Sequence, residues 1–481
     1  MNNVQSWARE EFAGVNLGDE RLNKRLARIA EAVSSNPNAS IPRTFVNMSA
    51  TKACYNFLAS EKVTPVKVLM PHQQRTVERL RQHPVVLVAQ DITDLDFTGR
   101  RSLSGLGYLD TPYLLGLKVQ TALAITPEGA PLGILEQHTW IRPLEELATR
   151  TRSQKSQRNS ARPIGQKQTQ RWLDVQESVY RQCADSGSTV VVVADREADF
   201  YEFFALPRPE RMHALIRVRH DRKLESEQIG LRAALAAQPV FGHYRCEVPR
   251  GGERPPRRAT LTVRALSTTL SRPAKPNSAE APECVDVRLI EATESNPPSG
   301  QKPISWTLLT TLPITTIEDA ARIIVYYTRR WLVERFHYTL KSGCAIEQLQ
   351  LESRERIEVA LAIYSVVAWR LMDLLYQSRV SPQADAAEHF DADELVVLRA
   401  VATTQQPTKS RTTNRRIAQR PVESLTLRQA VIVIARKGGF LARAGDGEPG
   451  IKTLWHGLTK LAEMVDALRL LRQADPLMGN A

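Results

Sequence analysis

Three acidic side chains have the types and spacing of a shared divalent metal site. Asp91 follows a short apolar run after one Gln, Asp195 follows a second apolar run after one Ala, and Glu334 lies in a helical stretch. Magnesium and similar hard cations prefer oxygen ligands and usually take one or two carboxylates together with substrate phosphate. The three residues therefore indicate metal-dependent chemistry on phosphates, although either aspartate alone also fits a turn. Asp94 is the alternative to Asp91 for the first position.

The helical stretch around Glu334 mixes charges on one face. At 100° per residue, four of its residues fall within about 60° of one another: Tyr327, Arg330, Glu334 and Lys341. The spacing of Arg330 and Glu334 fits an i, i+4 ion pair on a solvated face. The other interpretation is a metal-binding glutamate beside phosphate-directed cations, which phosphodiester chemistry on DNA requires.

The spacing of these four residues resembles the Tyr-Arg-Glu-Lys signature of the IS4 family of bacterial insertion-sequence transposases, to which the Tn5 transposase belongs. The string DREAD at 195–199 resembles the stretch that carries the second catalytic aspartate of that family, and QDIT at 90–93 resembles the stretch that carries the first. Three motifs in this order are much harder to obtain by chance than any one of them. One departure is Ile92, where the family has Thr in an Asp-Thr-Thr string.

The resemblance implies an α/β multidomain fold with an RNase H-like catalytic core, in which helices flank a mixed sheet. The expected domains are a helical DNA-end-binding domain over residues 1–70, a catalytic domain over 71–375 with a β-rich insertion at about 206–303, and a helical C-terminal dimerisation domain over 376–481. The order of helical and strand-like periodicity along the chain agrees with this arrangement.

Hydrophobic periodicity predicts the individual elements, and continuous apolar runs indicate buried strands. Strands are expected at residues 85–89, 115–125, 132–140, 189–193 and 306–310. Helices are expected within 7–67 and at 170–184, 316–341, 357–374, 424–437 and 451–472.

By the same resemblance, Asp91, Asp195 and Glu334 are the catalytic carboxylates and hold two magnesium or manganese ions. Such ions activate the attacking water or 3′ hydroxyl and stabilise the leaving oxygen. The resemblance further implies a homodimer in a synaptic complex that nicks the transposon end, closes a hairpin, reopens it with water and joins the 3′ end to target DNA. Two other classes remain compatible with these residues: a structure-specific nuclease or resolvase on the same core, and a non-catalytic DNA-binding protein.

The resemblance also implies DNA contacts. Tyr327, Arg330 and Lys341 are expected to position phosphates, and Trp306 to accept a flipped base, although Trp306 in an apolar strand equally suits a core residue. A basic strand and loop are expected to hold the DNA end through Arg217, Arg219, Arg222 and Lys223, and the first domain is expected to hold it through Arg21, Arg25 and Arg28. Both arginine-rich segments also have the pattern of an ordinary solvated surface that binds no DNA.

Composition agrees with a polyanionic partner. The 481 residues include 65 Lys and Arg against 52 Asp and Glu, a net charge of +13, although basic proteins that bind no nucleic acid exist. The five cysteines lack zinc-ligand spacing and are interpreted as reduced thiols. No secretory signal is apparent and no segment approaches the roughly eighteen apolar residues of a membrane span, so a cytoplasmic, nucleoid-associated protein without a membrane partner is expected. The basic stretch 150–171 is expected to be a mobile loop or linker.

Overall fold

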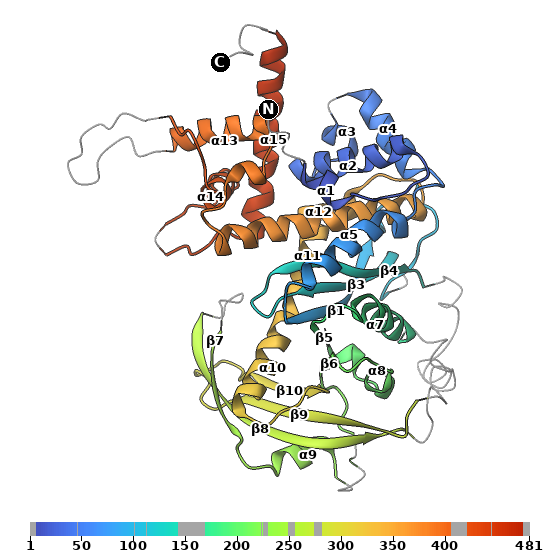
Figure 1. The fold of residues 1–481 in the computed structure, drawn as a ribbon, viewed down its shortest axis with the longest axis vertical. Coiled ribbons are helices and arrows are strands. Elements are labelled where there is room, and N and C mark those ends of the chain that lie inside the picture. The colour runs from blue at the N-terminus through green and yellow to red at the C-terminus, as the bar shows by residue number, and fades with distance from the viewer. Residues whose placement is uncertain are drawn as a thin grey trace, which may run out of the picture.

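The computed structural model describes residues 6–45, 47–100, 102–111, 113–142, 169–222, 224, 229–248, 255–273, 281–405, 421–443 and 445–474. Most of the expected basic loop at 150–171 lies outside the described residues, and so does Lys223. Helices occupy both ends of the chain, and a large twisted sheet lies between them in the sequence (Figure 1).

The N-terminal part is helical, as predicted. The Asp19 side chain begins the second helix by accepting the backbone N–H of Arg21 at 2.9 Å, because the first turn of a helix has no intrahelical partner for that group. Leu26, Ile29 and Val33 form the buried face of this helix. The helices are α1 (Trp7–Glu11), α2 (Glu20–Ser35), α3 (Ile41–Thr44), α4 (Met48–Leu58) and α5 (Pro65–Leu80).

The described strands form one mixed sheet in the order β2-β3-β1-β5-β6-β10-β9-β8-β7, with β4 paired to β3. Strand β5 pairs in parallel with β1 and β6, and the other described pairs are antiparallel. The predicted mixed sheet is thus confirmed. The strands are β1 (Val85–Asp96), β2 (Gly107–Tyr108), β3 (Leu115–Ile125), β4 (Pro131–Trp140), β5 (Thr189–Ala194), β6 (Met212–Arg217), β7 (Gly242–Val248), β8 (Arg257–Ser271), β9 (Cys284–Glu294) and β10 (Ser305–Thr310).

Helices cover both faces of the central strands (Figure 1). Alternate residues of a strand face opposite sides, and Val88 and Val192 lie in one buried cluster with α7 and α8. Ala89 and Val193 face the other side, where both are buried in a second cluster with α10, α11 and α12. A residue two positions beyond Ala89 or Val193 therefore faces α10 to α12. The helices are α7 (Gln170–Cys183), α8 (Tyr201–Ala205), α10 (Ile317–Arg329), α11 (Trp331–Tyr338) and α12 (Arg354–Val380).

The strands β7, β8 and β9 extend the central sheet rather than forming a separate one. Strand β9 pairs with β10, β8 pairs with β9, and β7 pairs with β8. The expected β-rich range 206–303 also contains β6, which pairs in parallel with β5 and lies at the centre of the sheet. The short helix α9 (Leu231–Ala236) lies against β8 and β9 in this part of the fold.

The long helix α12 lies at the centre of the molecule. Its 27 residues qualify as a membrane span by length and composition, which corrects the expectation that no segment approaches one. However, 89% of its most apolar window is buried inside the structure, against α2, α5, β4, α14 and α15. That environment is typical of a core helix.

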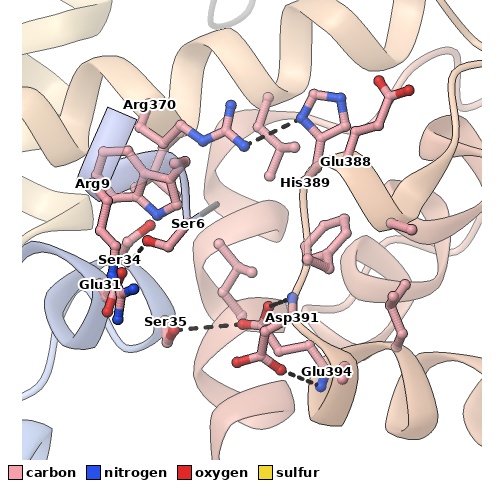
Figure 2. Close-up of a pocket in the computed structure, with 18 residues that line it drawn as sticks. Ser6, Arg9, Glu31, Ser34, Ser35, Arg370, Glu388, His389, Asp391 and Glu394 are labelled. Atoms are coloured by element: carbon pink, nitrogen blue, oxygen red, sulfur yellow. Dashed lines mark hydrogen bonds between the residues drawn. The ribbon is translucent and has the colours of Figure 1, made fainter. Parts of the chain in front are cut away.

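The N-terminal and C-terminal helices meet across a cavity of about 520 Å³ beside α12. Figure 2 shows its polar side chains turned toward one another: Arg370 lies 3.2 Å from His389, and Ser35 donates to Glu394 at 3.5 Å. These pairs connect α2 and α12 to the C-terminal part. The C-terminal helices are η6 (Ala386–Glu388), α13 (Ala392–Thr404), α14 (Leu427–Lys437) and α15 (Ile451–Ala474).

This junction makes the stability of the protein depend on pH. Burial, and secondly the neighbouring Asp391 carboxylate, raise the pKa of Glu394 to about 7. The folded protein therefore holds a proton that the unfolded chain releases above its ordinary pKa of 4.5. The free energy of unfolding falls as pH rises from 4.5 to about 7, by about 3 kcal/mol, and this contribution is constant above that range.

We expect Glu394→Gln, which stays neutral, to remove this fall and to be more stable than the wild type above pH 7. Urea unfolding at pH 5 and pH 8 measures the difference. The matched control is Glu388→Gln, which changes an exposed glutamate at the same cavity. If the unfolding curves of the wild type and Glu394→Gln shifted equally between the two pH values, Glu394 would not be the source of the pH dependence.

Candidate active site

Asp91 and Asp195 lie level with each other on neighbouring parallel strands. Ala89 of β1 pairs with Val193 of β5, and the same register continued by two residues brings Asp91 opposite Asp195. Both residues have the strand parity that faces α10 to α12. Neighbouring strands lie about 4.8 Å apart, so the two carboxylates are adjacent, and Asp91 acts electrostatically on Asp195.

Asp91 lies inside β1 rather than after its end, which corrects the expected strand boundary. The apolar run stops at Ala89, but β1 continues to Asp96 because β3 pairs with it from Leu87 onward. Strand β5 pairs with β1 only as far as Ala89. Asp91 therefore lies where β1 has lost one of its two neighbouring strands.

The segment that carries Glu334 consists of three short pieces rather than the expected helix over 316–341. Helix α10 is followed by α11 and then by a π turn at Thr339–Gly343. At the first junction, the N–H groups of Arg330 and Val333 bond three residues back, at 3.1 and 3.0 Å, which tightens the helix locally. π turns occur frequently at functional sites.

Arg330 lies between Glu334 and Asp91. Its Nη2 pairs with Glu334 Oε1, and its Nη1 lies 3.9 Å from Asp91 Oδ1. The Arg330 side chain is 15% exposed and that of Glu334 is 43% exposed. The i, i+4 ion pair of Arg330 with Glu334 and the approach of Arg330 to Asp91 are therefore both present, and Glu334 has the more exposed side chain of the ion pair.

Negative charge concentrates around Asp195. Burial raises the pKa of its carboxyl group, and the Asp91 and Glu334 carboxylates raise it further, whereas the Glu197 backbone N–H and Arg330 lower it. The Glu197 N–H donates to Asp195 Oδ1 at 2.7 Å. Crowding of like charges raises the energy of the ionised form, and a divalent cation bound there would relieve that crowding.

The chemistry of these donors fits a hard divalent cation, because Asp91, Asp195 and Glu334 offer only carboxylate oxygens. Within the described part of the chain, no three Asp, Glu, His or Cys side chains gather closely enough to hold a metal ion as they stand. Glu334 is paired with Arg330 instead. To hold a cation together with the two aspartates, Glu334 would have to leave Arg330.

Tyr327 connects this helical segment to β6 and β10. Its buried side chain interacts with Arg330 and with Arg217 at the end of β6. Burial raises the pKa of the Tyr327 phenol, which stays neutral. The half-buried Trp306 of β10 contacts Tyr327 edge-on, with ring centroids 6.3 Å apart. Trp306 is thus half-buried: it packs against the core cluster and contacts Tyr327.

Asp94 does not share the face of β1 on which Asp91 lies. Asp94 lies three residues further along β1, so its side chain has the opposite parity, and it pairs with Lys118 of β3. Lys341 donates to the backbone oxygen of Asp94 at 2.7 Å and lies 3.2 Å from Glu347. Lys341 therefore contacts β1 at Asp94, three residues along the strand from Asp91, which Arg330 approaches.

Two residues near the site were missed by sequence reasoning. His337 Nδ1 lies 3.7 Å from Asp91 Oδ2, and its buried Nε2 has no hydrogen-bond partner among the described residues. Its spacing of three from Glu334 could have indicated a shared face. Asp199 is the second: its buried carboxylate binds the loop after β6, and no local pattern predicts so distant a partner.

The other predicted DNA contacts lie in two places. At the end of β6, Arg219 is exposed, whereas the Arg222 guanidinium pairs with Asp199. On α2, Arg21 and Arg28 are exposed and Arg25 is half-buried. Helix α12 lies between α2 and the sheet (Figure 1), so these arginines are remote from the carboxylates. All of these contacts stay predictions.

Three matches to known families together span most of the chain. Residues 4–63 match the family described as transposase DNA-binding, residues 136–370 match the transposase DDE domain, and residues 366–475 match the transposase Tn5 dimerisation domain. The DDE match contains Asp195 and Glu334 but begins after Asp91, so the assignment of Asp91 rests on its register with Asp195.

These matches confirm the expected fold class and support the expected partners. A DDE domain implies an RNase H-like core, and the observed mixed sheet with flanking helices agrees with it. The two terminal matches support DNA as a partner and the formation of a dimer. The chain is a Tn5-like DDE transposase of the IS4 family, and thus an enzyme that acts on DNA.

Proposed function

We propose that this transposase moves DNA by a cut-and-paste route: it binds the inverted repeats at the transposon ends, cleaves them and joins the 3′ ends to target DNA. The observation that supports this most is the level placement of Asp91 and Asp195 on adjacent strands, facing the segment that carries Glu334. A third carboxylate on a helix beside two strand carboxylates is the donor set that phosphodiester chemistry needs.

Asp91, Asp195 and Glu334 would hold magnesium or manganese, and two ions per site are proposed. Ions bound there would activate the attacking water or 3′ hydroxyl and stabilise the leaving oxygen. The aspartates keep their positions because Asp91 is paired with Thr121 of β3 and Asp195 caps the turn that follows β5. Glu334, with its more exposed side chain, is the ligand that moves.

Arg330 has two alternative partners in this proposal. In the protein alone it neutralises Glu334 and lies near Asp91. A phosphate of the DNA end would compete with Glu334 for this guanidinium, because phosphate, like carboxylate, accepts two parallel hydrogen bonds. Binding of the DNA end would therefore draw Arg330 away from Glu334 and release the third carboxylate. Tyr327 and Lys341 would position phosphates beside it.

The other predicted DNA contacts are assigned from the chemical group that each residue offers to DNA. Trp306 would stack on a base flipped from the DNA end, Arg217 and Arg219 would bind phosphates near the site, and Lys223 would extend this group. The arginines of α2, Arg21, Arg25 and Arg28, would contact the inverted repeat. A homodimer would hold two ends in a synaptic complex, in the cytoplasm and on the nucleoid.

Incubation of the purified protein with a labelled duplex that carries the inverted repeats bounding its gene, plasmid DNA and Mg²⁺ tests this route. We expect a nick at the 3′ end, then a hairpin that migrates at twice the strand length in a denaturing gel, and finally label joined to plasmid. Nicks without joined label would identify a nuclease or resolvase. Binding without nicks would identify a non-catalytic DNA-binding protein.

A further inference from the structure

Asp199 holds the basic loop that follows β6. Its Oδ2 accepts the backbone N–H groups of Arg219 and His220 at 2.6 and 2.8 Å, and its Oδ1 pairs with the guanidinium of Arg222. The Asp199 side chain is 0% exposed. A buried carboxylate is costly unless it is fully hydrogen-bonded, and charge-assisted bonds are the stronger kind. One side chain therefore fixes three residues of this loop.

Asp199 also belongs to the same short turn as Asp195. The 3₁₀ turn η3 (Arg196–Ala198) joins them, and Asp195 caps it through the N–H of Glu197. The Asp199 N–H donates to the backbone oxygen of Arg196 at 3.4 Å. The turn thus carries one carboxylate directed at the catalytic site and a second directed at the loop. The loop cannot shift relative to Asp195 without breaking the bonds to Asp199.

The loop presents cations beside the catalytic site. Arg217 interacts with Tyr327, and the exposed Arg219 acts electrostatically on Glu197, whose N–H binds Asp195. Arg222 is different, because its side chain is 21% exposed and faces the buried Asp199 carboxylate. A guanidinium that neutralises a buried charge is not free to bind phosphate without leaving that charge unpaired, which is strongly unfavourable.

We propose that Asp199 is a positioning residue for DNA cleavage, which fixes the phosphate-binding loop relative to the catalytic carboxylate of Asp195, and that Arg222 serves as its counterion rather than as a phosphate ligand. This inference rests on the proposed function of the site. It assigns different roles to the two aspartates of the DREAD string and to the neighbouring arginines of the loop.

Asp199→Asn tests the positioning role with little change of shape. The amide oxygen still accepts the N–H groups of Arg219 and His220, but the amide NH₂ then faces the Arg222 guanidinium, so two donors oppose each other. We expect the rate of the first nick in DNA-saturated complexes with Mg²⁺ to fall about 10- to 100-fold, the usual effect of losing a group that orients a ligand. Single-turnover rates at saturating DNA exclude effects of weaker binding or lower stability.

The double variant Asp199→Asn with Arg222→Gln tests whether the nicking rate recovers when the two side chains are again complementary. The Gln side chain offers an acceptor to the new amide, so we expect the double variant to nick faster than Asp199→Asn alone. The matched control is Asp221→Asn in the same loop, because the Asp221 carboxylate accepts the Arg232 N–H at 2.9 Å, within α9 rather than in the loop held by Asp199. This control is expected to nick at the wild-type rate.

The salt dependence of binding separates the two arginines. Each phosphate contact contributes about 0.9 to the slope of log affinity against log salt concentration. Arg219→Gln is expected to reduce this slope by about one, and Arg222→Gln to leave it unchanged. If Arg222→Gln lost as much slope as Arg219→Gln, the counterion role of Arg222 would be overturned. If Asp199→Asn nicked at the wild-type rate, or if the double variant nicked no faster than Asp199→Asn, the positioning role of Asp199 would be overturned. Failure of the wild type to nick the same duplex would instead overturn the proposed function.

Discussion

Glu334→Gln is expected to abolish cleavage of the DNA end while binding of the end survives. The amide keeps the shape of the side chain but removes the negative oxygen that a divalent cation prefers. Metal assistance supplies several kcal/mol of transition-state stabilisation, so the first nick should slow by about a thousandfold or more. Binding should persist because the change removes a negative charge near the DNA and leaves Arg330 without its i, i+4 carboxylate.

Gel-shift and nicking assays on the same labelled duplex measure both effects. The matched control is Glu318→Gln, which changes an exposed glutamate on α10 and should retain both binding and nicking. Cleavage that persists with Mg²⁺ in the Glu334→Gln protein, at a rate close to the wild type, would remove Glu334 from the catalytic set. Loss of binding and nicking together would show that the change disrupts the fold instead.

Gly457→Ala is expected to destabilise the C-terminal part of the protein and weaken the dimer. Helix propensity alone predicts the opposite, because Ala is favoured over Gly inside a helix by about 1 kcal/mol. However, a Cβ at Gly457 would lie 1.9 Å from the backbone oxygen of Ile434 in α14. Relief of this overlap requires α14 and α15 to move apart, and overpacking of this kind typically costs about 1–3 kcal/mol. Gly457→Val should cost more.

Sedimentation of the DNA complexes and urea unfolding measure the two consequences. Gly438 provides an independent test, because a Cβ there would lie 1.9 Å from the Thr453 backbone oxygen at the same crossing of α14 and α15. Gly445→Ala is the control, since nothing lies within 4 Å of its added Cβ. If Gly457→Ala raised stability as helix propensity predicts, the close approach of these helices would not exist in solution.

The local elements followed from the sequence because their signals are local. The apolar runs at 189–193 and 306–310 and the helical spacing at 451–472 depend on neighbouring residues only, and the structure has strands or a helix at each. The prediction failed where polar residues continue a paired strand. Asp91 looks like the end of a strand, yet β3 holds β1 in extended form to Asp96.

The sequence by itself determined that two aspartates and Glu334 are candidates for metal-dependent chemistry, since spacing and residue type are enough to place a charged stripe on a helix. Only the tertiary structure decided how these groups meet. The parallel register of β1 and β5 brings Asp91 level with Asp195, Arg330 takes Glu334 as its partner, and Asp199 binds a loop about twenty residues away. Such contacts depend on strand pairing and packing between segments far apart in the chain, which no local pattern encodes.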